Sequence, residues 1–226
     1  MTNWEKFADS FLNARVAAEY LPKIIDGFWL TIQLAFCIIL TGLAAGLAMA
    51  VLRSFGLRVL NWLIIFTVDL FRALPPLVII TLLYFGLPGL GLQLGGFAAS
   101  WLALSLVLMA FAEEIFWAGI TAVPKGQWEA ARSTGLSFMQ TLGYVVLPQA
   151  LRMTIPPLTN RTIAITKGTA LASVVAVPEI LGAAQAGVSF SFNPTPLTLG
   201  AAAYLVLFIP VVFLGRWIET RFAWKR

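Results

Sequence analysis

The side chains best suited to chemistry are charged or hydroxyl groups that interrupt long apolar runs: Asp69, Arg72, Glu113, Glu114, Lys167 and Thr169. An ionisable group inside a membrane-spanning helix costs about 2.5–3.5 kcal/mol on insertion scales, so it faces a partner, water or a bound solute. Asp69 and Arg72 are three positions apart and share a helical face. We expect them to line a polar pathway or to form a structural ion pair.

The two adjacent glutamates point about 100° apart on a helix, so only one of them faces a given spot. Lys167 lies about 21 Å along its span and is therefore expected to be deep in the membrane. Thr169 is able to donate a hydrogen bond to a carboxylate. Two interpretations stay open: Lys167 and Thr169 form a substrate-carboxylate or gating cluster, or Lys167 neutralises Glu114 or Asp69.

Other chemistry is excluded by residue types that the sequence lacks. There is no histidine, which excludes a histidine-based metal site, proton relay or Ser-His triad. The single cysteine, Cys37, excludes an intrachain disulfide. None of the five lysines follows a glycine, so the chain has no Gly-Lys-Ser/Thr phosphate loop. We therefore expect no metal, no cofactor and no enzymatic activity in this chain.

The amino-acid composition indicates which kind of helix carries these charged residues. Of 226 residues, 60% are hydrophobic and 11% are charged, against about 45–50% and about 25% in soluble domains. The chain is therefore predicted to be an all-α membrane protein with one transmembrane domain over residues 1–226. Five apolar stretches are long enough to span a bilayer: residues 27–52, 59–85, 97–122, 153–177 and 197–215.

The N-terminal segment, residues 1–22, is not a cleavable signal, because it contains three acidic residues and no apolar core of its own. Trp4, Phe7 and Phe11 fall on one helical face, which predicts an interfacial helix on the outer leaflet. The alternative is a disordered tail. In the first span, Gly42 and Gly46 form a GxxxG pattern, which is typical of close helix packing.

Basic residues predict the orientation of the spans. With the N-terminus outside, three basic residues lie in external segments and nine lie in cytoplasmic ones. These nine are Arg53, Arg58, Lys125, Arg132, Arg152, Arg216, Arg221, Lys225 and Arg226. The positive-inside rule then favours an N-out, C-in topology. The net charge of +5 is explained by this orientation rather than by binding to nucleic acid.

The long cytoplasmic loop, residues 123–152, has the pattern of a docking element. Pro124 suits the first turn of a helix, and Gly135 suits the position just past its end. Ala130 and Ala131 permit close approach of another protein, and Glu129 offers a carboxylate for a charge-assisted hydrogen bond. The loop is therefore predicted to form a helix, a tight turn and a second helix that dock another chain.

This loop resembles the EAA motif of ABC importer permeases in the spacing of Glu129-Ala130-Ala131, Gly135, Val145 and Leu147-Pro148. Residues 70–77, 84–88, 124–128 and 147–152 resemble the polar amino acid permeases, which handle histidine, glutamate, glutamine, arginine and opines. The resemblance implies an ABC type I importer permease fold. Its coupling helix would include Trp128, Glu129, Ala130, Ala131 and Arg132, and it would end near Gly135.

The resemblance also implies partners and a location. A second permease protomer, identical or different, would complete the pathway. Two cytoplasmic ATPases would hold ATP and magnesium, and an extracytoplasmic solute-binding protein would deliver an amino acid at the bacterial cytoplasmic (inner) membrane.

The family pattern places its acidic residue at Glu114, which leaves Glu113 as a helix-end carboxylate in headgroup water. Trp117, Arg161 and Gly168 depart from the pattern, so the charge class of the substrate stays open. The alternative function is a self-contained secondary amino acid transporter or channel. Such a protein is expected to have inverted repeats and no docking loop.

Overall fold

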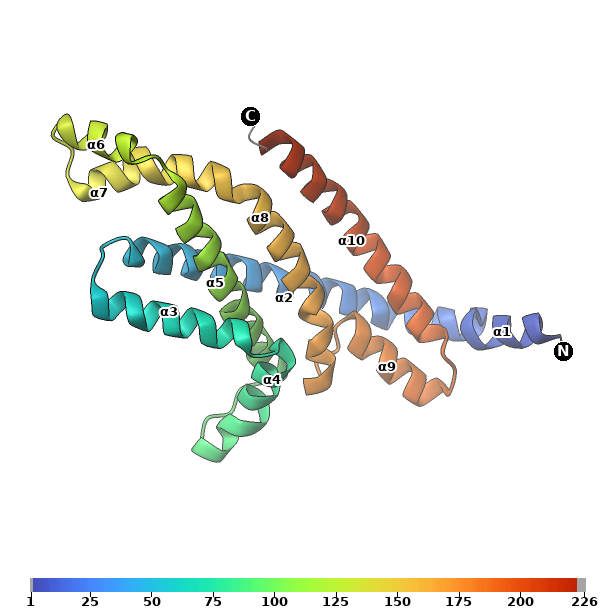
Figure 1. Cartoon of the computed structure of the whole chain (residues 1–226). Helices are drawn as coiled ribbons and strands as arrows, with labels where there is room; N and C mark the ends of the chain where they lie inside the picture. Colours follow the sequence, from blue (N-terminus) through green and yellow to red (C-terminus); the bar gives the residue numbers. More distant parts are fainter. Residues whose placement is uncertain (1, 223–226) are drawn as a thin grey trace. The chain divides into compact units, whose positions relative to one another are not determined.

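The computed structural model describes residues 2–222, and all regular structure in that range is helical (Figure 1). Lys225 and Arg226, which contribute to the predicted orientation, lie outside the described residues. The ten α-helices in this range are α1 (Asn3–Phe11), α2 (Ala14–Arg53), α3 (Arg58–Ala73), α4 (Pro76–Thr81), α5 (Gly96–Ala122), α6 (Lys125–Ser133), α7 (Phe138–Thr141), α8 (Leu147–Lys167), α9 (Ile180–Ser191) and α10 (Thr195–Phe222). Short π or 3₁₀ segments are η1 (Leu82–Gly86), η2 (Leu87–Leu90), η3 (Leu142–Val146) and η4 (Gly168–Val175).

Four helical stretches are long and apolar enough to cross a bilayer: Asn3–Arg53, Gly96–Ala122, Phe138–Ser191 and Thr195–Phe222. A fifth candidate is the broken pair Arg58–Ala73 and Pro76–Leu90. The break lies where the chain reads Leu74-Pro75-Pro76, because a residue before proline is driven out of the helical region. Leu74 and Pro75 are both extended, with ψ of 133° and 135°.

The helices differ in extent from the apolar stretches of the sequence. The first stretch, 27–52, lies inside α2, which begins at Ala14 and contains Pro22. The fourth, 153–177, lies in α8 and η4 except for its last two residues, which follow the end of η4. The sequence reasoning missed α9 entirely. The helix follows Pro178 and is an uncharged run rich in alanine and glycine, and the Glu179 side chain caps it by accepting a hydrogen bond from Gly182 N.

The chain forms two compact units. Within the described residues, unit 1 comprises residues 2–38, 75–104 and 166–212, and unit 2 comprises residues 39–74, 105–165 and 213–222. In unit 2, the predicted close packing at the GxxxG pattern is confirmed. A Cβ added to Gly46 would lie 2.7 Å from the Ala112 Cβ, and one added to Gly42 would lie 2.8 Å from the Leu108 Cβ. These glycines therefore bring α2 against α5.

Unit 1 is held by backbone contact between α2 and the start of α9. A Cβ on Gly27 would lie 2.9 Å from the Glu179 carbonyl carbon. Thr31 Oγ1 accepts a hydrogen bond from Ile180 N at 3.3 Å. Tyr204 on α10 donates to Glu179 Oε2 at 2.5 Å, which fixes α10 to the same point.

The N-terminal helix α1 is helical, as predicted, and begins with a capping box between Thr2 and Glu5. Its three aromatic rings share one face, where Phe7 stacks on Trp4 at 5.6 Å and on Phe11 at 4.9 Å. Asn13 N donates to Thr195 Oγ1 at 3.0 Å, which ties the end of α1 to the start of α10. The location of α1 at the outer leaflet stays a prediction.

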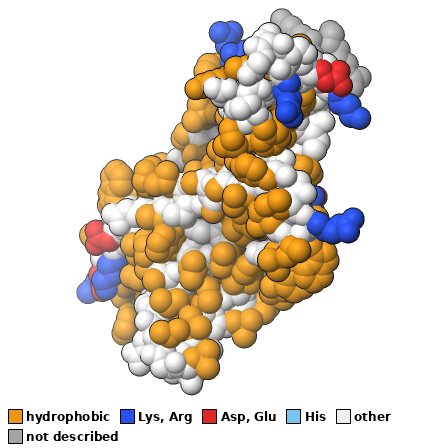
Figure 2. Space-filling model, turned by 90° about the vertical axis from the view of Figure 1, so that its left-hand side faces the viewer, with side chains coloured by type: hydrophobic (Ala, Val, Ile, Leu, Met, Phe, Trp, Pro, Cys, Tyr) orange, Lys and Arg blue, Asp and Glu red, His pale blue; other side chains and the backbone are white. Residues whose placement is uncertain are grey.

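Large apolar side chains are exposed on most of the long helices. Figure 2 shows one face on which hydrophobic side chains dominate and charged groups are few. Such a surface is stable only in contact with lipid or another apolar surface.

Candidate functional site

The predicted docking loop forms a helix, a turn and a second helix. Helix α6 begins after Pro124, which is extended at ψ 138°. Its end is marked by Gly135, whose φ of +89° lies in the left-handed region that favours glycine. The next helix, α7, begins at a capping box in which Ser137 and Gln140 exchange side-chain and backbone hydrogen bonds. The sequence prediction of this local structure is confirmed.

Two of the predicted coupling residues hold α6 in place. The Trp128 ring stacks on Phe138 at 5.8 Å, and Phe138 packs on Phe55 at 5.6 Å. Ala131 is 8% exposed and belongs to the buried side of the helix. Ala131 and Trp128 therefore fix α6 against α7 and η3 rather than presenting a surface outward.

The other residues of the motif point away from this packing. Glu129, Ala130 and Arg132 are exposed. The exposed face of α6 therefore carries a carboxylate, a small methyl group and a guanidinium, which together offer a polar contact for another protein.

A second group of functional candidates lies on α3 and α5 in unit 2. Arg72 Nη2 lies 2.8 Å from Glu114 Oε2, and Arg72 Nη1 lies 3.8 Å from Asp69 Oδ1. Asp69 and Arg72 therefore lie within ion-pair distance, which is one of the two alternatives left open by the sequence, and Glu114 joins them. All three side chains keep exposed surface, and that of Glu114 is 49% exposed.

Glu113 is not the water-exposed carboxylate that the sequence reasoning expected. It is fully buried, and Arg53 Nη1 donates to both of its carboxylate oxygens, at 3.1 and 3.3 Å. The Arg53 guanidinium also lies 4.6 Å from the Trp117 ring centroid. The expectation of a carboxylate in headgroup water was wrong because the Arg53 guanidinium compensates the charge of Glu113 inside the protein. Sequence reasoning missed Arg53 in this role, because its position at the end of α2 indicated orientation only.

Lys167 and Thr169 belong to unit 1, at the junction of α8 and η4. Lys167 is exposed, with Nζ 5.9 Å from the Phe208 ring centroid. Thr169 is buried and donates its hydroxyl hydrogen to the Thr166 carbonyl at 2.8 Å. That hydroxyl is therefore engaged within its own helix.

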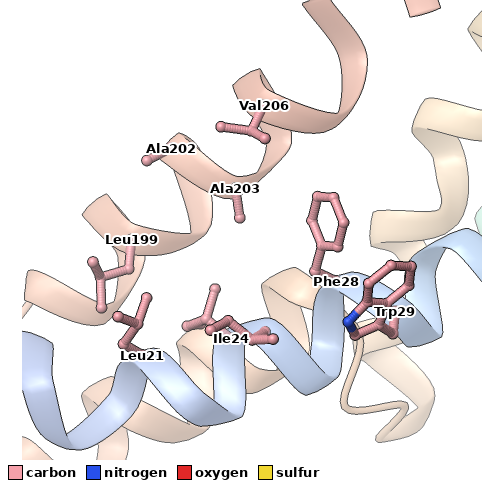
Figure 3. A pocket seen from close by; sticks show the side chains of 9 residues that line it. Leu21, Ile24, Phe28, Trp29, Leu199, Ala202, Ala203 and Val206 are labelled. Carbon is pink, nitrogen blue, oxygen red and sulfur yellow. The ribbon is translucent and has the colours of Figure 1, made fainter. Parts of the chain in front are cut away.

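Unit 1 also contains an apolar pocket of about 380 Å³ between α2 and α10. Figure 3 shows Leu21, Ile24, Phe28 and Trp29 of α2 facing Leu199 and Ala203 of α10. The walls carry almost no polar surface, so the pocket offers nothing to hold a charged solute. Across residues 2–222, no cluster of acidic or cysteine side chains has the arrangement of a metal site.

Comparison with known proteins gives consistent matches over most of the chain. Residues 22–224 match the family model described as binding-protein-dependent transport system inner membrane component. The chain is 42% identical over 167 residues to the probable glutamine ABC transporter permease protein GlnP of Bacillus subtilis (strain 168), covering 74% of this chain and 77% of that protein. It is 36% identical over 211 residues to the probable glutamine ABC transporter permease protein GlnM of the same strain, covering 93% and 98%.

A solved structure shares the fold. The crystal structure of an amino acid ABC transporter with histidines contains a chain that matches with a TM-score of 0.81 and 31% identity. The match covers 90% of this chain and 96% of that one.

Proposed function

Because the chain belongs to the family of binding-protein-dependent transport system inner membrane components, we propose that it forms half of the translocation pathway of an importer for a polar amino acid. It is a permease subunit of an ABC importer, a multi-pass membrane protein and not an enzyme. The two similar permeases named above are described as glutamine permeases, and the similar structure is that of an amino acid transporter. These likenesses support an amino acid as the solute.

We propose that a second permease protomer, identical or different, completes the pathway. An extracytoplasmic solute-binding protein delivers the amino acid, and two cytoplasmic ATPases hold ATP and magnesium. This chain binds no cofactor. The protein lies in the bacterial cytoplasmic (inner) membrane with five spans, counting α3 and α4 as one. Its N-terminus is outside and its C-terminus inside, which agrees with the distribution of basic residues.

The ATPases dock on the exposed face of α6. Glu129, Ala130 and Arg132 make the contact, while Trp128, Ala131 and Gly135 keep the helix in position. The observation that carries this proposal is the division of the motif into an exposed face and a packed face.

The charged residues of the spans form the polar part of the pathway. Arg72, with Asp69 and Glu114, offers both signs of charge on partly exposed side chains, which suits a zwitterionic amino acid. Lys167 and Thr169, which lie in unit 1, are proposed as further residues of the pathway. Glu113 acts indirectly, because its pairing with Arg53 holds the segment of α5 that carries Glu114.

The test compares Glu129→Ala with Glu19→Ala, since both residues are exposed glutamates on helices. Loss of a hydrogen bond to a charged group is worth about 1.5–3 kcal/mol, so Glu129→Ala should weaken ATPase binding about 10- to 100-fold. Membrane insertion should be unchanged in both variants. Equal ATPase binding by the two variants would remove Glu129 from the contact.

The alternative, a self-contained secondary transporter or channel, is tested in proteoliposomes. An ABC importer takes up the amino acid only when ATP is supplied on the cytoplasmic side and the binding protein on the other. Uptake driven by an ion gradient without co-purifying ATPase would favour the alternative.

A further inference from the structure

Arg161 on α8 has an unusual environment at mid-membrane. Its guanidinium lies 3.8 Å from the ring centroid of Phe111 on α5. Phe111 stands about 22 Å from Gly96 and about 17 Å from Ala122, at 1.5 Å per residue. The stacked pair is therefore close to the middle of the α5 span. Both residues belong to unit 2.

The acidic side chains of α3 and α5 in unit 2 are already paired with other arginines. Glu113 pairs with Arg53, while Glu114 and Asp69 pair with Arg72. In residues 2–222, the only interaction recorded for Arg161 is the aromatic ring. A guanidinium at this depth without an anion is expensive, so a negative group from outside the chain is expected to neutralise it.

Resting on the function proposed above, we propose that Arg161 binds the carboxylate of the transported amino acid. A guanidinium is planar and presents two parallel N–H groups in its plane, a fork-like geometry that matches the two oxygens of a carboxylate. The Phe111 ring lies within cation–π distance of this guanidinium, and the Arg72 guanidinium lies 5.5 Å from the same ring centroid. A cation–π contact uses the ring face, so it restrains the Arg161 guanidinium without accepting hydrogen bonds from its N–H donors.

Every amino acid has an α-carboxylate, and an acidic amino acid has a second carboxylate on its side chain. The test separates these two sources by measuring equilibrium binding of radiolabelled L-glutamine, L-glutamate and L-arginine. The permease–ATPase complex is studied in lipid discs without ATP or binding protein. Agmatine, which is arginine without its carboxylate, is the fourth probe.

Arg161→Gln is expected to weaken binding about 10- to 100-fold, the value of a hydrogen bond to a charged group. A loss shared by all three amino acids assigns Arg161 to the α-carboxylate, and a loss confined to L-glutamate assigns it to the side chain. In the first case, agmatine should bind the wild type as weakly as L-arginine binds the variant. Arg58→Gln, which removes an exposed arginine at the start of α3, should leave every affinity unchanged.

Two further variants keep the test decisive if Arg161→Gln does not assemble. Arg161→Lys keeps the charge without the planar fork, and Phe111→Leu removes the ring, so both should lose part of the affinity. Unchanged affinity in all three variants would overturn the proposal, as would a wild type that binds none of the amino acids. If a variant keeps its affinity for the amino acids but no longer holds the second permease, the anion that neutralises Arg161 belongs to that protomer, and the proposal is overturned. Because binding is measured without ATP, failure here is distinct from an absent or uncoupled ATPase.

Discussion

Replacement of Arg53 by methionine tests the buried ion pair of unit 2. The change keeps an unbranched, apolar stem but removes both hydrogen bonds to Glu113, whose carboxylate has no exposed surface. Leaving a buried charge without its partner costs about 3–5 kcal/mol. Loss of the contact with the Trp117 ring adds about 0.5–2 kcal/mol. We expect the free energy of unfolding to fall by about 3.5–7 kcal/mol in total.

The double variant Arg53→Met with Glu113→Leu should recover most of that loss, because well-packed apolar residues replace buried ion pairs at little cost. The assay is titration of the detergent-solubilised permease with sodium dodecyl sulfate, followed by near-ultraviolet circular dichroism. Asp69→Asn is the matched control, since Asp69 is 66% exposed and its contact with Arg72 is long. That change should lower stability by less than about 1 kcal/mol.

The coupling energy from the double-mutant cycle decides the outcome. If the two single changes simply add in the double variant, the residues are not energetically coupled. The reasoning from burial would then be refuted.

Three other changes have distinct readouts. Gly46→Leu should lower the free energy of unfolding by about 1–3 kcal/mol or more, because the new side chain collides with Ala112. Gly143→Ala is the control and should not lower it, because a Cβ at Gly143 meets open space. The dodecyl sulfate titration measures both variants. Tyr204→Phe should cost about 1–3 kcal/mol by removing a donor from the buried Glu179 carboxylate, a loss seen as a lower midpoint of thermal unfolding. Trp128→Ala should speed hydrogen exchange of the α6 amides about 5- to 30-fold, for a local loss of about 1–2 kcal/mol, and unchanged exchange would show that the ring does not hold the helix.

The sequence was most informative where the structure is local. The α6 helix follows from Pro124 and Gly135, and the placement of Asp69 and Arg72 on one helical face follows from a spacing of three. The close contact at Gly46 follows from the absence of a side chain. Each of these depends on residues near one another along a single helix or turn.

Contacts between distant segments were not predictable from one sequence. Nothing in the spacing shows that Arg53 meets Glu113, which is 60 positions away. The division of the coupling motif was also hidden, because it depends on the Phe138 ring that covers Trp128. Helix α9 was missed for a different reason: its twelve residues are too few for a span, and the capping signal at Glu179 was not used.

The order in which the docking element is formed follows from its short-range contacts. Trp128 and Phe138 are ten positions apart, so little loop-closure entropy opposes their meeting. Contacts of this kind form within microseconds, far faster than residues are added during synthesis. The α6–α7 hairpin can therefore fold as soon as it leaves the ribosome, before α8 is inserted. If the proposed ATPase contact is made at α6, the partner meets an ordered surface, and association spends no binding energy on ordering that loop.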